Sequence, residues 1–116
     1  MYYLYLIENL NGRAGFGITG NPKSRNRDYV AGCGDIVDFK YLYGGSSAHV
    51  KKIENVIKNQ YVDNVWKIDG RPLEWLNNDV SMDQLKDYVD TLITERHYRV
   101  ELVTNDYNFT KDELDI

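Results

Sequence analysis

Three side chains with different reactive groups stand far apart along the chain: the phenol of Tyr5, the guanidinium of Arg25 and the carboxylate of Glu54. A guanidinium is a planar fork that suits a phosphate carrying extra negative charge. A carboxylate is a ligand that Mg²⁺ or Mn²⁺ prefers, and water and phosphate can fill the other positions. A phenol, with a pKa near ~10, acts as a base at neutral pH only beside a cation. Singly, each is more common as an ordinary strand tyrosine, surface arginine or solvated glutamate.

The elements that would position these groups begin with a β-hairpin. Residues 3–7 are β-forming and predict a first strand. Asn11-Gly12 is a strong hairpin signal and predicts a turn into a second strand over residues 13–19. Gly15 and Gly17 interrupt that strand, and glycines inside a strand indicate a bulge or the close approach of another group.

A short helix that is polar on most faces is predicted next. Asn21 is a typical N-cap and Pro22 a typical first helical residue, so we expect the helix to begin at Pro22. Gly32 predicts its end after Ala31. A helix with so little apolar surface must be held by its neighbours, and it presents its polar side chains to something else.

The third strand and the second helix follow. Residues 36–43 predict the strand, which Gly44-Gly45 would stop. Ser46 or Ser47 would cap a helix over residues 48–61, whose apolar residues recur every three or four positions. Glu54 lies at the edge of that apolar stripe, and His49 lies one turn before Ile53, where it could border a site that includes Glu54.

The rest of the chain predicts one more helix and one more strand. We expect residues 62–78 to be irregular, with both tryptophans in the core. Ser81 and Gln84 form a capping box for a helix over 82–94, and residues 98–103 predict the last strand. We expect the acidic tail, 104–116, to be loose.

The order of these elements predicts the fold class. It is α+β, with a small three-stranded antiparallel sheet flanked by helices and an extra C-terminal helix and strand. Residues 1–103 would form one domain.

Composition fits a single folded domain. The 116 residues are 42% hydrophobic and 28% charged. The single cysteine, Cys33, excludes an internal disulfide and a cysteine-based zinc cluster and fits a reducing compartment. No apolar run has the ~18 residues of a membrane span, and the first residues lack the basic flank of a secretory signal. We therefore expect a cytoplasmic protein.

Charge is distributed unevenly. The net charge is -4, which opposes nucleic-acid binding overall. Residues 1–60, however, carry eight Lys and Arg against five Asp and Glu, whereas residues 61–116 carry six against thirteen. A local cationic face in the first half is therefore still expected.

In their order along the chain, these residues resemble the GIY-YIG nuclease superfamily. Tyr3-Leu4-Tyr5 stands at the first motif, Gly15-Phe16-Gly17 at the second, and Arg25 at the catalytic arginine. Glu54 stands at the metal-binding glutamate. Residues 17–25 and 72–76, the latter with Glu74 and Trp75, are similar to a phage-associated branch, and the resemblance covers residues 2–78.

This resemblance implies a metal-dependent endonuclease that hydrolyses DNA phosphodiester bonds, for example a phage homing or genome-competition nuclease in the host cytoplasm. Tyr5 would take the proton from the attacking water, Arg25 would bind the phosphate, and Glu54 would anchor Mg²⁺ or Mn²⁺. The side chains expected on the DNA backbone are Lys23, Arg27, Lys51 and Lys52, with Lys58 near them.

Two other functions stay open at this point. Gly15 stands where the family has a tyrosine, and Phe16 has no hydroxyl, so the second hydroxyl is either missing or supplied by another residue. The chain could therefore be a catalytically inactive module of the same fold that binds nucleic acid or protein. It could also be an interaction protein whose acidic tail mimics the charge of DNA.

Overall fold

The computed structural model describes residues 1–8, 12–33, 38–68, 71–77 and 79–105, with side chains omitted at 30–33, 38, 66–68, 71–74 and 104–105. Its centre is an antiparallel sheet of six strands in the order β4-β5-β2-β1-β3-β6. The strand bounds are β1 Tyr2–Glu8, β2 Ala14–Thr19, β3 Asp38–Gly45, β4 Val65–Ile68, β5 Arg71–Leu76 and β6 Val100–Asn105. The predicted α+β class is confirmed, but the predicted three-stranded sheet is wrong, because β5, β4 and β6 extend the central strands β2, β1 and β3.

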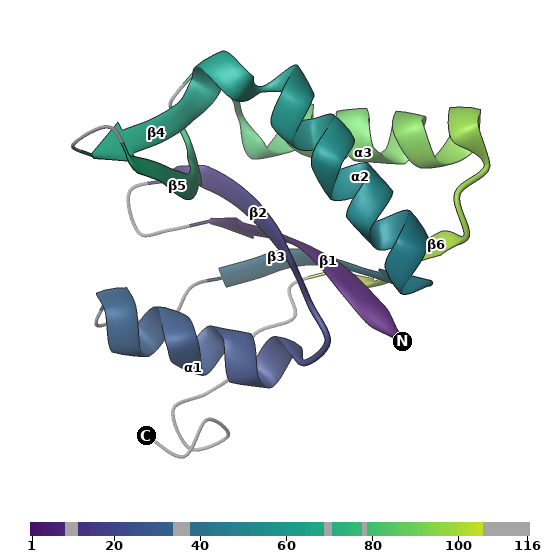
Figure 1. Cartoon of the computed structure of the whole chain (residues 1–116), viewed down its shortest axis with the longest axis horizontal. Coiled ribbons are helices and arrows are strands. Elements are labelled where there is room, and N and C mark those ends of the chain that lie inside the picture. The colour runs from purple at the N-terminus through teal and green to yellow at the C-terminus, as the bar shows by residue number, and fades with distance from the viewer. Residues whose placement is uncertain (9–11, 34–37, 69–70, 78, 106–116) are drawn as a thin grey trace.

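Helices cover both faces of this sheet. Helix α1, Pro22–Cys33, lies on one face, whereas α2, Ser47–Gln60, and α3, Met82–Arg96, lie on the other (Figure 1). Successive side chains of the central strand β1 point to opposite faces. Leu4 therefore packs on the α2 side and Tyr5 on the α1 side.

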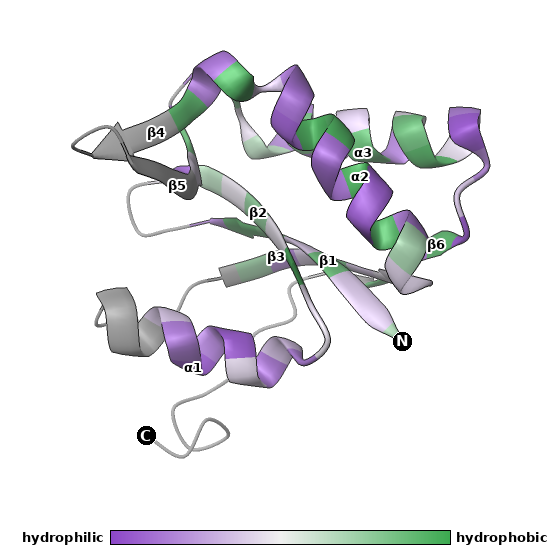
Figure 2. Cartoon of the chain, viewed as in Figure 1, coloured by the Kyte–Doolittle hydropathy of each residue, from purple (hydrophilic) through white to green (hydrophobic). Residues whose placement is uncertain are grey.

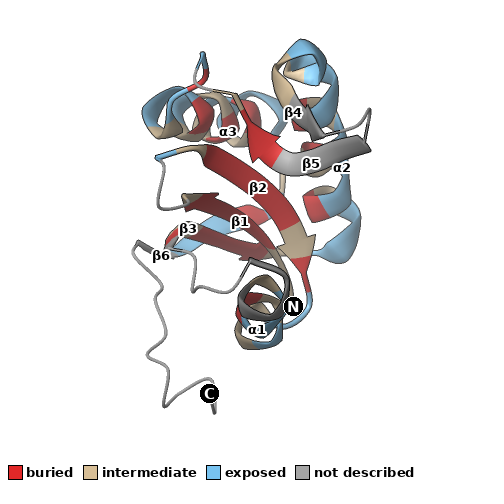
Figure 3. Ribbon diagram, turned by 90° about the vertical axis from the view of Figure 1, so that its left-hand side faces the viewer, coloured by how far each residue is buried: buried red, intermediate tan, exposed pale blue. Residues whose placement is uncertain are grey.

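The larger hydrophobic core lies between the sheet and the pair α2 and α3. Helix α2 buries Val50, Ile53 and Ile57, as its apolar stripe predicts. The central strands are almost entirely buried, whereas the outer faces of these helices are exposed (Figure 3). This packing fixes α2, and with it Glu54, on the side of the sheet that Leu4 faces.

The smaller core lies under α1 and is mainly aromatic. It contains Tyr5, Phe39 and Trp75, with Tyr29 of α1 packed against them. The part of α1 whose side chains the structure describes, residues 22–29, is mostly hydrophilic (Figure 2), and within it Tyr29 packs against the aromatic core. Trp75 is 8% exposed, which confirms its predicted place in the core.

The helix starts agree with the predicted caps. Asn21 Oδ1 accepts a hydrogen bond from the Ser24 amide at 3.1 Å. Ser46 caps α2, and Ser81 forms the expected capping box with Gln84 at the start of α3. The helix starts could be predicted from local sequence because each cap side chain accepts a hydrogen bond from an amide only three residues away.

Several predicted boundaries were wrong. Helix α1 continues through Gly32 to Cys33. Strand β3 includes Gly44 and Gly45, which were expected to stop it. Gly45 is required there because a Cβ would come within 2.2 Å of the Arg99 carbonyl oxygen, at the start of β6.

The segment predicted to be irregular, residues 62–78, is also a correction. It contains a 3₁₀ turn, Val62–Asn64, and the strands β4 and β5. These strands pair with each other, and β5 joins the main sheet through the single pair Gly15 and Trp75. The sequence did contain a signal for this hairpin, because Asp69-Gly70 stands between the two strands and Asp-Gly is typical of a two-residue turn.

The last strand is shifted from the predicted 98–103 to Val100–Asn105. The expectation of a loose tail is wrong for Thr104 and Asn105, which lie in β6, and its remainder, 106–116, lies outside the described residues. Asn11, which belongs to the predicted turn, and the side chain of Trp66 also lie outside the described part of the chain. Among the helices that are described, none is long and apolar enough to cross a lipid bilayer.

A buried tyrosine links β3 to α3. Tyr43 is 1% exposed, and its hydroxyl donates to Asp90 Oδ1 at 2.7 Å. Asp90 also binds the ammonium of Lys86, which lies 4.8 Å from the centre of the Tyr41 ring. Burial, and then the neighbouring Asp90 carboxylate, raise the pKa of the Tyr43 hydroxyl well above its ordinary value. The folded chain therefore keeps this hydroxyl protonated in alkaline solution.

We predict that Tyr43→Phe lowers the free energy of unfolding by about 1 kcal/mol at neutral pH, because the hydrogen bond to Asp90 is lost. Because the folded-state pKa is raised, this residue's contribution is complete below the unfolded pKa of ~10 and falls as pH rises above it. The deficit of Tyr43→Phe should therefore shrink in alkaline solution. Urea denaturation at neutral and alkaline pH measures it, and a deficit that is independent of pH would contradict the assignment.

Candidate active site

Tyr5 is the centre of the cluster under α1. Its side chain is 0% exposed, and its ring stacks on Phe39 with centroids 5.1 Å apart. The ring meets that of Tyr29 edge-on at 6.3 Å. The Tyr5 and Tyr29 hydroxyls are hydrogen-bonded to each other at 3.0 Å. Strand β1 and helix α1 thus bring two phenols together.

Gly17 leaves the space that this arrangement needs. It lies opposite Tyr5 in the regular register of β1 and β2. A Cβ at this position would be 2.2 Å from the Tyr5 hydroxyl oxygen. Of the two expected reasons for a glycine in this strand, the close approach of another group is therefore confirmed, and the register shows no bulge. The approaching group is the candidate catalytic phenol.

Tyr29 is a candidate site residue that the sequence analysis did not identify. The second motif has Gly15 in place of tyrosine, and Gly15 pairs with Trp75 of β5. A second hydroxyl comes instead from Tyr29, which follows Arg25 by four residues on α1. Residues at this spacing lie on neighbouring positions of one helix face, so the spacing was the available signal.

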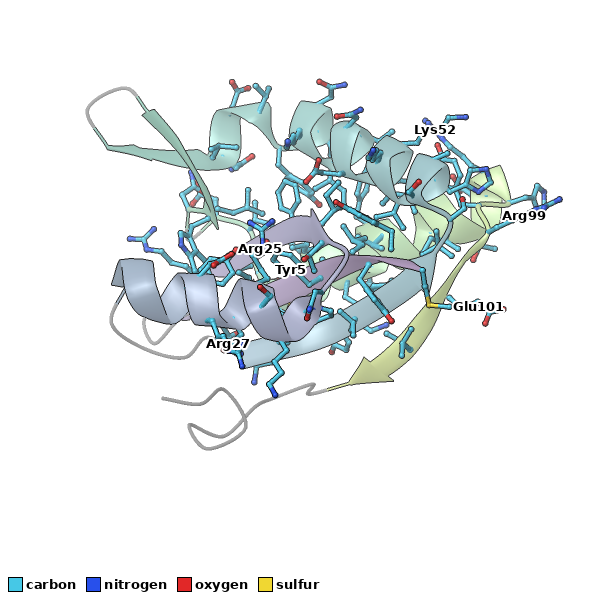
Figure 4. The ribbon with its side chains drawn as sticks, turned by 60° about the horizontal axis from the view of Figure 1, so that its bottom comes forward. Tyr5, Arg25, Arg27, Lys52, Arg99 and Glu101 are labelled. Atoms are coloured by element: carbon cyan, nitrogen blue, oxygen red, sulfur yellow. The ribbon has the colours of Figure 1, made fainter. Side chains whose placement is uncertain are left out.

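Arg25 reaches the same region from α1. Its Nη2 donates to the carbonyl oxygen of Ile18 at 3.5 Å, and its side chain is half-buried. Ile18 lies near the end of β2, beyond the single pair that joins β2 to β5. Arg25 and Tyr5 lie close together in the view of Figure 4, between α1 and the sheet. Two of the three predicted catalytic groups therefore share the α1 side.

Glu54 lies in the other layer, on α2. Its carboxylate oxygen Oε1 accepts from the Lys58 ammonium at 3.3 Å, and its side chain is 15% exposed. Among the described residues, no hydrogen bond or ion pair joins Glu54 to Tyr5 or Arg25. The structure does not bring the third predicted group into direct contact with the first two.

The direction in which Glu54 faces follows from its neighbours on α2. Lys51, three residues earlier and on the same side of the helix, lies 5.9 Å from the centre of the Tyr2 ring. That ring is within 3.4 Å of where a Cβ on Gly20 would stand, just after β2. Lys51 and Arg25 therefore lie near the Ile18–Gly20 end of β2 on opposite faces of the sheet, and Glu54 is on the same side of α2 as Lys51.

His49 does not border this region. Its Nδ1 accepts from the Arg99 amide at 2.8 Å, and its ring lies 5.4 Å from that of Tyr98. It therefore faces the connection between α3 and β6, away from Lys51. His97 is exposed and caps the C-terminus of α3 in a left-handed conformation with φ 54°.

The predicted DNA contacts fall into two groups. Lys23 and Arg27 are on α1, whereas Lys51 and Lys52 are exposed on α2, across the sheet. Arg27 points away from Tyr5, and Lys52 lies at the far side of the molecule from it (Figure 4). These two groups of cations therefore lie on opposite faces of the sheet and do not form one continuous patch.

A metal ion would depend mainly on Glu54. Within the described part of the chain, no three His, Cys, Asp or Glu side chains gather as a metal-binding set. Mg²⁺ can use one carboxylate, with water and substrate phosphate in its other positions. Lys58 binds only Oε1 of Glu54, so Oε2 can accept a metal. The residues present fit an ion that binds together with its substrate.

Comparison of the chain with family models, with curated proteins and with solved structures finds no match. The resemblance to GIY-YIG nucleases therefore rests on the residues of the sequence alone.

We predict that Gly17→Ala lowers the free energy of unfolding by roughly 1–3 kcal/mol, because the methyl group must displace the buried Tyr5 ring. Gly20→Ala is the matched control, since its Cβ would make an ordinary contact with the Tyr2 ring at 3.4 Å. Chemical denaturation of both variants measures the difference. Equal stability of the two would show that Tyr5 does not approach Gly17 as described.

Proposed function

We propose that this chain is a divalent-metal-dependent DNA endonuclease of the GIY-YIG type. The observation that carries the proposal is the hydrogen-bonded pair of Tyr5 and Tyr29, with Arg25 one helical turn from Tyr29 on the same face. An ordinary aromatic core needs neither two hydroxyls facing each other nor an arginine beside them. Phosphodiester hydrolysis needs both a proton acceptor and a cation for the phosphate.

Each group has a separate task in this proposal. Tyr5 accepts the proton of the attacking water as a phenolate, with the Arg25 guanidinium as its counter-ion, and Tyr29 donates a hydrogen bond that holds the Tyr5 oxygen in place. Arg25 binds the phosphate and stabilises the charge that develops on it. Because Tyr5 is 0% exposed, DNA binding must move α1 or the end of β2 enough to admit the reacting water.

Glu54 is the proposed ligand of Mg²⁺ or Mn²⁺. The bound ion would lower the charge on the phosphate and assist the leaving oxygen. The residues proposed to hold the DNA backbone are Lys23, Arg27, Lys51 and Lys52, and phosphate contacts of this kind carry little sequence specificity.

In its biological setting, we propose, the enzyme acts as a phage homing or genome-competition nuclease in the host cytoplasm. Because phosphate contacts alone do not select a sequence, a partner or a second subunit would supply the target site.

We predict that the purified chain nicks or cuts plasmid DNA with Mg²⁺ and that EDTA stops it. Glu54→Gln and Arg25→Lys should each lower the rate on the order of 100-fold or more, since one loses the metal ligand and the other the phosphate fork. Glu95→Gln is the control, because Glu95 is an exposed helix glutamate on α3. Gel electrophoresis of the plasmid over time measures the rates, and full cutting by Glu54→Gln would remove the metal assignment.

We predict that Tyr29→Phe lowers the cleavage rate by roughly tenfold or more, because the Tyr5 hydroxyl loses its partner. Tyr98→Phe is the control, since Tyr98 lies in the other layer beside His49. The same plasmid assay compares them. Cleavage by Tyr29→Phe at the wild-type rate would show that Tyr29 only packs.

The second candidate function is a module of the same fold that binds without cutting. The burial of Tyr5 and the position of Glu54 in the opposite layer favour it. An intact plasmid with every divalent metal, together with a gel shift that weakens as salt rises, would select this function over the first.

A further inference from the structure

Asn26 is an unusual residue in the layer under α1. Its side chain is 0% exposed, and neither its Oδ1 nor its Nδ2 has a hydrogen-bond partner. The other buried polar side chain in the described part of the chain, Thr19, accepts from the Asn21 amide and donates to the Asn21 carbonyl. Of these two buried polar side chains, only Asn26 therefore lacks hydrogen-bond partners.

The position of Asn26 connects it with the candidate site. It directly follows Arg25 and precedes Tyr29 by three residues, so Asn26 and Tyr29 share the inner face of α1. Tyr29 carries the hydroxyl that meets Tyr5 at 3.0 Å. The unpaired carboxamide and the pair of phenols thus lie between the same helix and the same sheet.

A buried carboxamide without partners costs free energy that an apolar side chain of similar size would not cost. The stability of the fold therefore favours leucine at position 26, and something other than stability favours asparagine. Buried water molecules typically bind such otherwise unsatisfied groups.

We propose that Asn26 is a positioning residue that holds one buried water molecule between α1 and the sheet. This water hydrogen-bonds to the Tyr29 hydroxyl and fixes the direction in which Tyr29 faces Tyr5. The catalytic part of this inference rests on the proposed nuclease function, because a fixed Tyr29 matters for the rate only if Tyr5 transfers a proton. The water itself does not depend on that function.

The experiment compares wild type with Asn26→Leu, which removes both polar atoms, and Asn26→Ser, which keeps a donor and an acceptor. Asn59→Leu is the matched control, since it makes the same change at an exposed position of α2. High-resolution crystal structures should show the water beside Asn26 and Tyr29 in wild type and in Asn26→Ser, and not in Asn26→Leu. A dry Asn26 in the wild-type crystal would overturn the proposal whether or not the protein cuts DNA.

Cleavage kinetics test the positioning role. We expect Asn26→Leu to melt no lower than wild type while its kcat falls about tenfold or more with little change in KM, and its pH–rate profile shifts. Asn26→Ser should recover part of the rate. Wild-type kinetics in Asn26→Leu, or a loss of rate that accompanies a lower melting temperature, would overturn the role. Failure of wild type itself to cut would instead count against the nuclease proposal.

Discussion

The contact between the Tyr5 phenol and the backbone of Gly17 is the constraint on which the α1 side of the molecule depends. It lets a large polar ring lie flat against its own hairpin partner with no exposed surface. Phe39 then stacks on that ring, and Tyr29 meets its edge and its hydroxyl. Apart from Tyr29, the described side chains of α1 are mostly polar. This aromatic stack therefore sets the position of the helix on the sheet, and with it the position of Arg25.

The two faces of the sheet differ in the size and composition of the cores that they pack against. The α2 and α3 face carries the larger aliphatic core and well-capped helices. The α1 face is smaller and aromatic, and it contains the hydroxyl pair and the unpaired amide of Asn26. Unsatisfied polar groups are tolerated where function offsets their cost, and the larger core supplies the stability that makes this tolerable.

Much of the fold could be predicted because its signals are local. The caps at Asn21, Ser46 and Ser81 and the stripe of α2 each lie within a few residues of one another. The hairpin of β4 and β5 was missed although Asp69-Gly70 between its strands is a local turn signal. Its connection to the sheet could not be predicted, because that depends on the pairing of Gly15 with Trp75, from distant parts of the chain. In the site, Gly17 was correctly suspected of a close contact, whereas Tyr29 was missed because its role depends on how α1 lies on the sheet.

The two glycines with the closest approaches are constrained for different reasons. At Gly45 the obstacle is the Arg99 carbonyl oxygen, which is backbone and cannot be exchanged for something smaller. At Gly17 the obstacle is the hydroxyl of a single side chain. In related proteins with a smaller residue in place of Tyr5, position 17 would tolerate other side chains. Position 45 would remain glycine in every protein that keeps this fold. Conservation of glycine at position 45 would thus report conservation of the fold, and conservation of glycine at position 17 would report conservation of the phenol.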